Sequence, residues 1–407
     1  MSEIALSTVD APRVIERRPR WAQRSDYIKK TFARKYQTLT QWNAKGYAFS
    51  NALEDIATSV CEHAAKISCF STSEMEAMPD VPTVPFIVNN GISTWPAFEN
   101  WTTQSLNDRM GQSYFRLDDN HTGRIRLEQF LDYMKLSEDD APLYIFDSQF
   151  AVGADQDRMS LKNEYGPLSW FSSKVENDMF SIVLDKYRPP WRWVLIGGPR
   201  SGTNIHQDPL GTSAWNAVIT GEKLWVFFPP NTPAELRSPL GTTPSDASAM
   251  AWFAEIWPRV LEELERERHD STLKPFCTVQ KRGDVVFVPQ GWFHVVINLT
   301  ASIAVTHNFA MCRDSEQVIP LTVENEPKFA EKWMKRVLDL PSLKNSIESK
   351  LVSCESNDGA ASIEGILSNL PDGKSADDHE DSEEDNDDDW SGSDESNVAF
   401  SDDDGEV

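Results

Sequence analysis

The C-terminal half of the sequence contains a series of short apolar segments separated by turn-forming residues. From Trp191 onward these segments are WRWVLIGGP, TSAWNAVITGEKLWVFFPP, DVVFVPQGWFHVVINL and SIAVTHNFAM, with Gly, Pro, Asn and Ser between them. Short strands bounded by turn signals are typical of a β-sandwich or a closed barrel. We therefore expect a mainly β fold with helices on its flanks.

The rest of the chain changes in composition along its length. NALEDIATSVCEHAAKI and RLEQFLDYMKL have apolar residues at helical spacing, whereas VPTVPFIVNNG and PLYIFD are typical of short strands. A helical insert is expected from Asp246 to Arg268. The 407 residues divide into a basic, partly disordered N-terminal arm (1–44), a mixed helical region that packs on the core (45–160), the β domain (161–325), C-terminal helices (326–353) and an acidic disordered tail (354–407).

The segment NEPKFAEKWMKRVLDLP predicts a C-terminal helix with Pro327 in its first turn. Phe329, Trp333 and Val337 recur at helical spacing and share one face. We expect Trp333 to be exposed on this helix. A homodimer through the C-terminal helices would cover it.

Charge is distributed unevenly along the chain. Pro371–Val407 contains seventeen Asp and Glu residues and one lysine, Lys374, so this tail carries most of the net charge of −25. The N-terminal arm is instead basic, with Arg13, Arg17, Arg18, Arg20, Arg24, Lys29, Lys30, Arg34 and Lys35. The arm could bind nucleic acid or an import receptor, and the tail could attract basic proteins. The alternative for both is a solvated segment without a specific partner.

The cysteine pattern and the length of the apolar runs indicate the cellular compartment. The chain has five cysteines without a CxxC pair, which argues against a disulfide scaffold or a structural zinc module and favours a reducing compartment. The N-terminus lacks the apolar core of a signal peptide, and no run approaches the length of a membrane span. We expect a protein of the nucleus or the cytosol that does not enter a membrane.

His206 and Asp208 form an HxD pair in the segment NIHQDPLG. Residues i and i+2 of a strand point to the same face, so both side chains project together if the segment stays extended up to Pro209. Two histidines and one carboxylate, with three open positions, are the ligand set that suits non-haem Fe(II) oxygenases. The missing histidine has to come from a neighbouring strand.

The better candidate for this ligand is His294, near the start of the strand expected in PQGWFHVVINL. The other histidines lie in the acidic tail, a charged insert, a helix, a turn and a second strand (His379, His269, His63, His121 and His307). A single strand histidine is more often structural than a ligand. An HxD pair followed by a later strand histidine favours a metal site.

Lys223 lies in VITGEKLWVFF, which we expect to be the strand that follows His206 and Asp208 across a turn. The apolar residues after Lys223 would bury it, and a buried ammonium is costly unless an anion meets it. 2-Oxoglutarate would satisfy both features, because its 2-oxo and adjacent carboxylate groups chelate iron while its far carboxylate pairs with an ammonium. The alternative is an edge-strand lysine in solvent.

The chain resembles JmjC-domain oxygenases in four ordered segments: APLYIFDS, YRPPWRWVLIGGPRSGTNIHQDPLGTSAWNAVITGEKLWVFFP, GDVVFVPQGWFHVVINL and AVTHNFA. Within that group it most resembles the family of bifunctional arginine demethylases and lysyl hydroxylases, formerly described as phosphatidylserine receptors. The resemblance runs from about Trp95 to Ala310 and continues more weakly through the C-terminal helix. It implies a double-stranded β-helix, a jelly-roll or cupin-like core with the iron inside.

The resemblance also assigns site residues and an activity. The iron(II) ligands fall on His206, Asp208 and His294, and the co-substrate contacts fall on Lys223, Thr306, Asn216 and Tyr144. The implied enzyme is a dioxygenase that uses O2 and converts 2-oxoglutarate to succinate and carbon dioxide while it hydroxylates a C–H bond. On a lysine carbon this gives hydroxylysine, and on an N-methyl group of arginine it leads to loss of formaldehyde. We expect lysyl hydroxylation to be the main activity, because it places fewer demands on the pocket than demethylation of N-methylarginine does.

The partners implied by the resemblance are Lys- and Arg-rich protein segments, such as those of histones or splicing factors. Histone modification, RNA or chromatin association and a nuclear location, with the cytoplasm as a second compartment, would accompany such substrates. The sequence departs from the family in two respects. Its basic stretches for nuclear entry are reduced to the N-terminal cluster, and its serine-rich tail is replaced by Asp and Glu.

Three other functions are compatible with the same residues. A JmjC oxygenase could instead hydroxylate asparagine, histidine or a modified tRNA base. A metal-loaded barrel without catalysis could serve as a scaffold for chromatin or RNA-associated partners. A cupin-type isomerase or a zinc hydrolase could use the same barrel, although neither needs an ammonium at the far end of the pocket.

Overall fold

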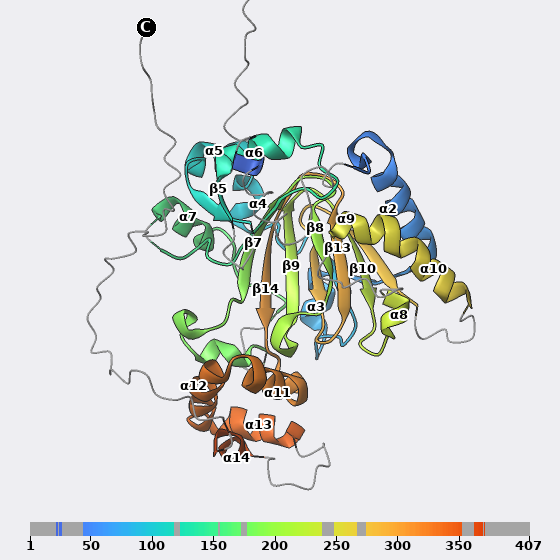
Figure 1. The fold of residues 1–407 in the computed structure, drawn as a ribbon. Coiled ribbons are helices and arrows are strands. Elements are labelled where there is room, and N and C mark those ends of the chain that lie inside the picture. The colour runs from blue at the N-terminus through green and yellow to red at the C-terminus, as the bar shows by residue number, and fades with distance from the viewer. Residues whose placement is uncertain are drawn as a thin grey trace, which may run out of the picture. The chain divides into compact units, whose positions relative to one another are not determined.

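The computed structural model of the chain contains two large β-sheets with helices on their outer faces (Figure 1). The structure describes residues 22, 24–26, 44–117, 123–153, 155–171, 177–237, 248–266, 274–351, 362–368 and 370. Most of the basic arm and of the acidic tail therefore lies outside the described residues. The mainly β class with flanking helices, expected from the strand pattern, is confirmed.

The strands form a five-stranded and a seven-stranded sheet. The smaller sheet has the spatial order β1 (Ala65–Lys66), β11 (Phe276–Gln280), β10 (Lys223–Phe228), β13 (Phe293–Asn298) and β8 (Gly202–His206). The larger has the order β2 (Ser68–Ser71), β3 (Phe86–Asn89), β12 (Val285–Val288), β9 (Ser213–Thr220), β14 (Ser302–Phe309), β7 (Arg192–Gly197) and β6 (Tyr144–Asp147). Neighbouring strands are antiparallel except in the pairs β1–β11 and β2–β3. A separate hairpin joins β4 (Tyr114–Arg116) to β5 (Arg124–Arg126).

Helices cover the outer faces of both sheets (Figure 1). Those beside the five-stranded sheet are α2 (Ala52–His63), α9 (Ala249–Ala251), the π-helix η8 (Trp252–Ile256) and α10 (Trp257–Arg266). The remaining helices before the C-terminal group are α3 (Thr72–Ala77), α4 (Pro96–Asn100), α5 (Thr103–Met110), α6 (Leu127–Leu136), α7 (Gln156–Ser160) and α8 (Ala234–Arg237). The C-terminal group is α11 (Ser315–Asn325), α12 (Pro327–Leu338), α13 (Pro341–Leu351) and α14 (Ile363–Ser368). Short 3-10 turns are η2 (Tyr47–Phe49), η3 (Leu161–Asn163), η4 (Met179–Ile182), η5 (Asp185–Tyr187), η6 (Pro209–Gly211) and η10 (Cys312–Asp314).

The central strands are mostly apolar because they are covered on both faces. Every residue of β10 is buried, as is every residue of β9 except its last. Trp225 and Phe227 of β10 share one cluster with Val286 and Val288 of β12, so the two sheets pack face to face there. The outer faces contact the helices. Strands buried on both sides read as continuous apolar runs rather than as alternating ones.

The mixed region 45–160 contains strands β1–β3 and β6, which belong to the two large sheets; β3 and β6 lie in the segments VPTVPFIVNNG and PLYIFD, which were expected to form short strands. The prediction of disorder after residue 354 is wrong for Ile363–Ser368, which form α14. Ile363 is fully buried in the C-terminal cluster, and Ile366 and Leu367 pack against it. Three apolar side chains within one short helix are enough to dock it on its neighbours.

The prediction that Trp333 is exposed is also wrong. Its side chain is 0% exposed and packs edge to face on Phe180, with ring centroids 4.9 Å apart. The indole N–H donates a hydrogen bond to the carbonyl of Met179 at 2.9 Å. The apolar face of α12 is therefore covered by η4 of the same chain, and a homodimer no longer follows from it. Pro327 does begin α12, as predicted.

No helix in the described part of the chain combines the length and the apolar character that a membrane span requires.

Replacing Trp333 with alanine should lower the free energy of unfolding by about 3–5 kcal/mol, because the change removes a fully buried aromatic side chain. Urea denaturation followed by circular dichroism measures this loss. Leu340→Ala is the control, since Leu340 is exposed and its truncation should cost less than about 0.5 kcal/mol. A loss for Trp333→Ala no larger than that of the control would contradict the packing described for α12.

Candidate active site

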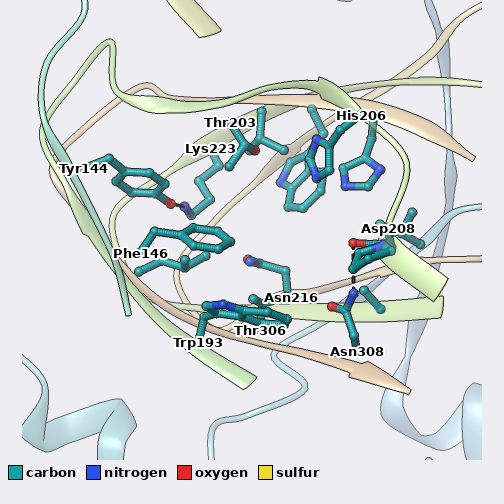
Figure 2. Close-up of a pocket in the computed structure, with 17 residues that line it drawn as sticks. Tyr144, Phe146, Trp193, Thr203, His206, Asp208, Asn216, Lys223, Thr306 and Asn308 are labelled. Atoms are coloured by element: carbon teal, nitrogen blue, oxygen red, sulfur yellow. Dashed lines mark hydrogen bonds between the residues drawn. The ribbon is translucent and has the colours of Figure 1, made fainter. Parts of the chain in front are cut away.

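A cavity of about 170 Å³ lies between the two sheets (Figure 2). Its walls come from strands of both sheets, and on most of these strands the lining residues alternate. The alternating pairs are Tyr144 and Phe146 on β6, Trp193 and Leu195 on β7, Ala214 and Asn216 on β9, Lys223 and Trp225 on β10, His294 and Val296 on β13, and Thr306 and Asn308 on β14. The cavity therefore follows the two-residue period of the strands that enclose it.

Strand β8 breaks this alternation through a β-bulge. His294 of β13 is opposite His206 of β8, but Val296 is opposite Thr203, so two residues of β8 face one residue of β13 between these pairs. The extra residue re-aims the side chains on one side of it. Both Thr203 and His206 consequently line the cavity.

His206 and Asp208 lie at one end of the cavity (Figure 2), and the ligand atoms of His206, Asp208 and His294 all lie within 4.8 Å of one another. Nδ1 of His206 contacts the Asn204 carbonyl at 2.7 Å, and Nδ1 of His294 contacts the Trp292 carbonyl at 3.2 Å. Carbonyl oxygens only accept hydrogen bonds, so in both rings the proton of this contact is on Nδ1 and Nε2 is directed away from the carbonyl. Burial also lowers the pKa of His294 well below its usual value, which keeps the ring neutral. Both histidines are thereby prepared to bind a metal through Nε2.

Asp208 supplies the carboxylate of this cluster. It lies two residues after the end of β8 in an extended conformation, and its Oδ1 accepts a hydrogen bond from Nδ2 of Asn308 at 3.2 Å. Its Oδ2 is buried and has no hydrogen-bond partner among the described residues. Burial raises the pKa of Asp208 against the opposing effects of His206 and Asn308. A divalent cation would give Oδ2 a partner, so the two histidines and this carboxylate fit a metal ion with open positions.

Lys223 lies at the opposite end of the cavity, beside Tyr144 (Figure 2). It begins β10 directly after a tight turn that contains Gly221 at φ 89°. The strand that directly follows Asp208 is in fact β9, so Lys223 lies one strand later than the sequence suggested. Lys223 is 1% exposed, and its Nζ donates to the hydroxyl of Tyr144 at 2.9 Å. Desolvation lowers the pKa of Lys223 to about 7, and no carboxylate of the described residues offsets this effect.

Asn216 and Thr306 lie between the two ends of the cavity (Figure 2). Oδ1 of Asn216 is buried without a hydrogen-bond partner among the described residues, so it is available to a bound molecule. The hydroxyl of Thr306 donates to the Trp215 carbonyl at 2.8 Å, which leaves its lone pairs available. The structure thus brings together all the residues that the resemblance assigned to the metal and to the co-substrate. Their roles stay predictions.

His307, the other strand histidine, is outside this cavity. Its Nε2 contacts the hydroxyl of Tyr165 at 3.2 Å, and its ring lies 4.2 Å from that of Trp215. Burial lowers its pKa well below the usual value. His307 therefore has a structural environment. His121, His269 and His379 lie outside the described residues.

Among the cavity residues that the sequence reasoning did not find are two with polar side chains, Asn308 and Thr203. Asn308 hydrogen bonds to Asp208 and follows Thr306 by two residues on β14, so the alternation of that strand could have revealed it. Thr203 precedes His206 by three residues and reaches the cavity only through the bulge in β8. The sequence of β8 carries no signal of that bulge.

The fold and the site together define a cupin-like β-sandwich that encloses a His–Asp–His cluster able to hold a metal ion and, across the cavity, a buried lysine.

Comparison with known proteins supports this class. Residues 79–315 match the family described as the cupin-like domain. Over 279 residues the chain is 37% identical to the bifunctional arginine demethylase and lysyl-hydroxylase psr-1 of Caenorhabditis elegans, and the match covers 66% of each chain. The protein of the same name in Caenorhabditis briggsae is 34% identical over 308 residues, or 73% of each chain. The 2-oxoglutarate and iron-dependent oxygenase JMJD4 of Gallus gallus is 32% identical over 141 residues, which cover 34% of this chain and 30% of that one.

The chain belongs to the cupin-like JmjC family that includes these bifunctional arginine demethylases and lysyl hydroxylases. The family match begins within the region 45–160 and extends through all the strands that line the cavity.

Replacing Asp208 with alanine should abolish stoichiometric Mn(II) binding while the protein remains folded, because one of three clustered ligands is lost. Isothermal titration calorimetry measures the binding, and circular dichroism checks the fold. Asp185→Ala is the matched control, since it removes a carboxylate that is 59% exposed and lies outside the cluster. Wild-type affinity in Asp208→Ala would show that the ligand assignment is wrong.

The lowered pKa of Lys223 predicts a pH-dependent KM for 2-oxoglutarate. The ammonium pairs with a carboxylate and the neutral amine does not, so affinity is retained below pH about 7 and falls as the pH rises above it. Where only the charged form binds, KM should rise by up to about tenfold per pH unit above this pKa. Steady-state kinetics give the profile. In Lys223→Arg the cation does not titrate in this range, so its profile should be flat; identical profiles for both proteins would contradict the role of Lys223.

Proposed function

We propose that this protein is an iron(II)- and 2-oxoglutarate-dependent oxygenase that hydroxylates lysine side chains of proteins, with demethylation of N-methylarginine as a second activity. The observation that carries this proposal is the buried ammonium of Lys223 across the cavity from the His–Asp–His cluster. An isomerase or a hydrolase built on the same metal centre would have no use for a desolvated cation there. A dicarboxylate that binds the metal at one end needs the ammonium of Lys223 to pair with the carboxylate at its other end.

Different residues of the cavity would bind the metal and the co-substrate. When held by His206, Asp208 and His294, iron(II) would supply the redox chemistry that couples decarboxylation of 2-oxoglutarate by O2 to oxidation of a C–H bond. Lys223 and the hydroxyl of Tyr144 would hold the far carboxylate. This ion pair forms in a site closed to water, where a charge-assisted hydrogen bond is at its strongest.

The walls of the cavity between these ends are largely apolar. Phe146 and Trp193 pack at a centroid distance of 5.6 Å beside Tyr144 and Leu195. They exclude water around the carbon chain of a bound dicarboxylate and restrict its orientation. Asn216 would offer its unpaired Oδ1 to a donor near the middle of the cavity. These residues position the co-substrate, and the protein substrate has to approach from the metal end.

Lysine hydroxylation and arginine demethylation are the same oxidation on different carbons. A hydroxylated lysine carbon is a stable product, whereas a hydroxylated N-methyl group loses formaldehyde and leaves arginine with one methyl group fewer. We place lysine hydroxylation first, because a lysine side chain is narrower than a methylated guanidinium. The relatives named above carry both activities in their names.

The charge of the chain supports a basic protein substrate. The net charge of −25 raises the local concentration of Lys- and Arg-rich segments and speeds their encounter with the protein. We further propose a nuclear location, with the cytoplasm as a second compartment, and histones or splicing factors as substrates. The basic cluster between Arg13 and Lys35 is suited to an import receptor or to RNA and chromatin, and most of it lies outside the described residues.

Incubation of the purified protein with iron(II), 2-oxoglutarate and a lysine-rich peptide should yield succinate and a peptide that has gained one oxygen atom on lysine. A second peptide with N-methylarginine should release formaldehyde more slowly. Mass spectrometry of both peptides and a succinate assay measure the products. Asp208→Ala should give neither product, because the metal centre is incomplete.

The outcomes separate the alternatives. Metal-loaded protein that never consumes 2-oxoglutarate would exclude the oxygenase and leave a scaffold. Succinate formation without change in either peptide would retain the oxygenase but redirect the search to asparagine, histidine or a tRNA base. Formaldehyde release faster than lysine oxidation would reverse the proposed order of the two activities.

A further inference from the structure

The turn that follows Asp208 has an uncommon backbone conformation. In η6, Leu210 has φ 56° and ψ 19°, in the left-handed region that residues with a branched apolar side chain rarely adopt. This residue lies two positions after a proposed metal ligand. Such conformations persist only where the surrounding structure holds them, and they often occur at functional sites.

The C-terminal helices hold this turn. The side chain of Leu210 packs against the buried cluster of the C-terminal helices, which also contains Phe180 and Trp333. The next residue, Gly211, has φ 66°, and a side chain there would come within 3.2 Å of Leu321 and 3.3 Å of the backbone of Val318. Helix α11 therefore lies directly against the turn, which has no room to move in that direction.

The same turn is connected to Asp208 on its other side. The hydroxyl of Thr212 donates to the Pro209 carbonyl at 2.7 Å and accepts a hydrogen bond from Nδ2 of Asn308 at 3.1 Å. Nδ2 of Asn308 also donates to Oδ1 of Asp208 at 3.2 Å. A shift of the turn would therefore change the position of the carboxylate and of its hydrogen-bond donor together.

The sheet itself does not fix Asp208. The last residue of β8 with a partner on β13 is His206, so the pairing that sets both histidines ends before the carboxylate. Beyond it the chain passes through Pro209 into the turn. The position of Asp208 relative to His206 and His294 is thus determined by the turn and by what the turn packs against.

We propose that Leu210 is a positioning residue of the metal centre, and that its anchorage in the C-terminal helices sets the carboxylate of Asp208. The inference rests on the proposed function in one respect, that the His–Asp–His cluster binds a divalent metal. Helix α11 contributes no residue to the lining of the cavity, yet it governs metal affinity through this contact. The C-terminal helices are then part of the active site's framework.

Four variants test the inference, with Mn(II) as the probe. Leu210→Ala removes the anchor and keeps a residue that disfavours the left-handed conformation, whereas Leu210→Gly removes the anchor and the strain together. Leu210→Met keeps an apolar anchor of similar volume. Ile347→Ala is the matched control, because Ile347 is fully buried in the same cluster but lies in α13. Calorimetry gives the Mn(II) affinity at a temperature where circular dichroism shows every variant folded.

Leu210→Ala and Leu210→Gly should both weaken Mn(II) binding by about 10–100-fold, the range found when residues that orient metal ligands are removed. Leu210→Met should retain wild-type affinity. Ile347→Ala should lower the melting temperature without a change in Mn(II) affinity. The visible absorption of the Co(II)-loaded protein should change in the Ala and Gly variants alone, because it reports the ligand geometry rather than the stability.

Wild-type Mn(II) affinity in both Leu210→Ala and Leu210→Gly would overturn the inference and leave the proposed function intact. Full affinity in Leu210→Gly alone would also overturn it, since the turn conformation and not the anchor would then matter. An equal loss of Mn(II) affinity in Ile347→Ala would also overturn the inference, because the loss would then follow from lower stability of the C-terminal helices. No Mn(II) binding by the wild-type protein would overturn the proposed function and this inference together.

Discussion

The desolvated ammonium of Lys223 is the constraint on which the rest of the site depends. A charged group removed from water needs an opposite charge or several hydrogen bonds, and in the described residues Lys223 has the Tyr144 hydroxyl alone. The free protein therefore carries a destabilised group between its sheets, which the large apolar clusters around it offset. A bound dicarboxylate would relieve this cost, so the free energy of its binding would include the neutralisation of a buried charge.

The position of this ammonium relative to the His–Asp–His cluster follows from strand register. In the antiparallel pair β10–β13, Lys223 is opposite Asn298 and Phe227 is opposite His294, so the lysine and the histidine are four residues apart along the strands. At about 3.3 Å per residue this is roughly 13 Å between their backbone positions. The long side chain of Lys223 spans part of that length. What remains suits a short dicarboxylate that binds iron at one end and the ammonium at the other.

The C-terminal helices belong to the same framework. Their apolar faces are directed inward, with Trp333 against Phe180, rather than toward a second copy of the chain. Through Leu210 they contact the turn after Asp208, the one proposed ligand that no strand pairing fixes. Strand pairing thus fixes the two proposed histidine ligands, whereas the third, Asp208, would be positioned by the turn that packs against the C-terminal helices.

The amino-acid sequence by itself determined the β class, the HxD pair, His294 and Lys223, because strands buried on two faces and residues two apart leave a local pattern. The same rule could have revealed Asn308 from Thr306. Only the tertiary structure decided the burial of Trp333, the docking of α14, the cavity position of Thr203 and the left-handed Leu210. A bulge is a mismatch between two strands, and burial depends on which distant element covers a side chain. Neither property is contained in any single segment of the chain.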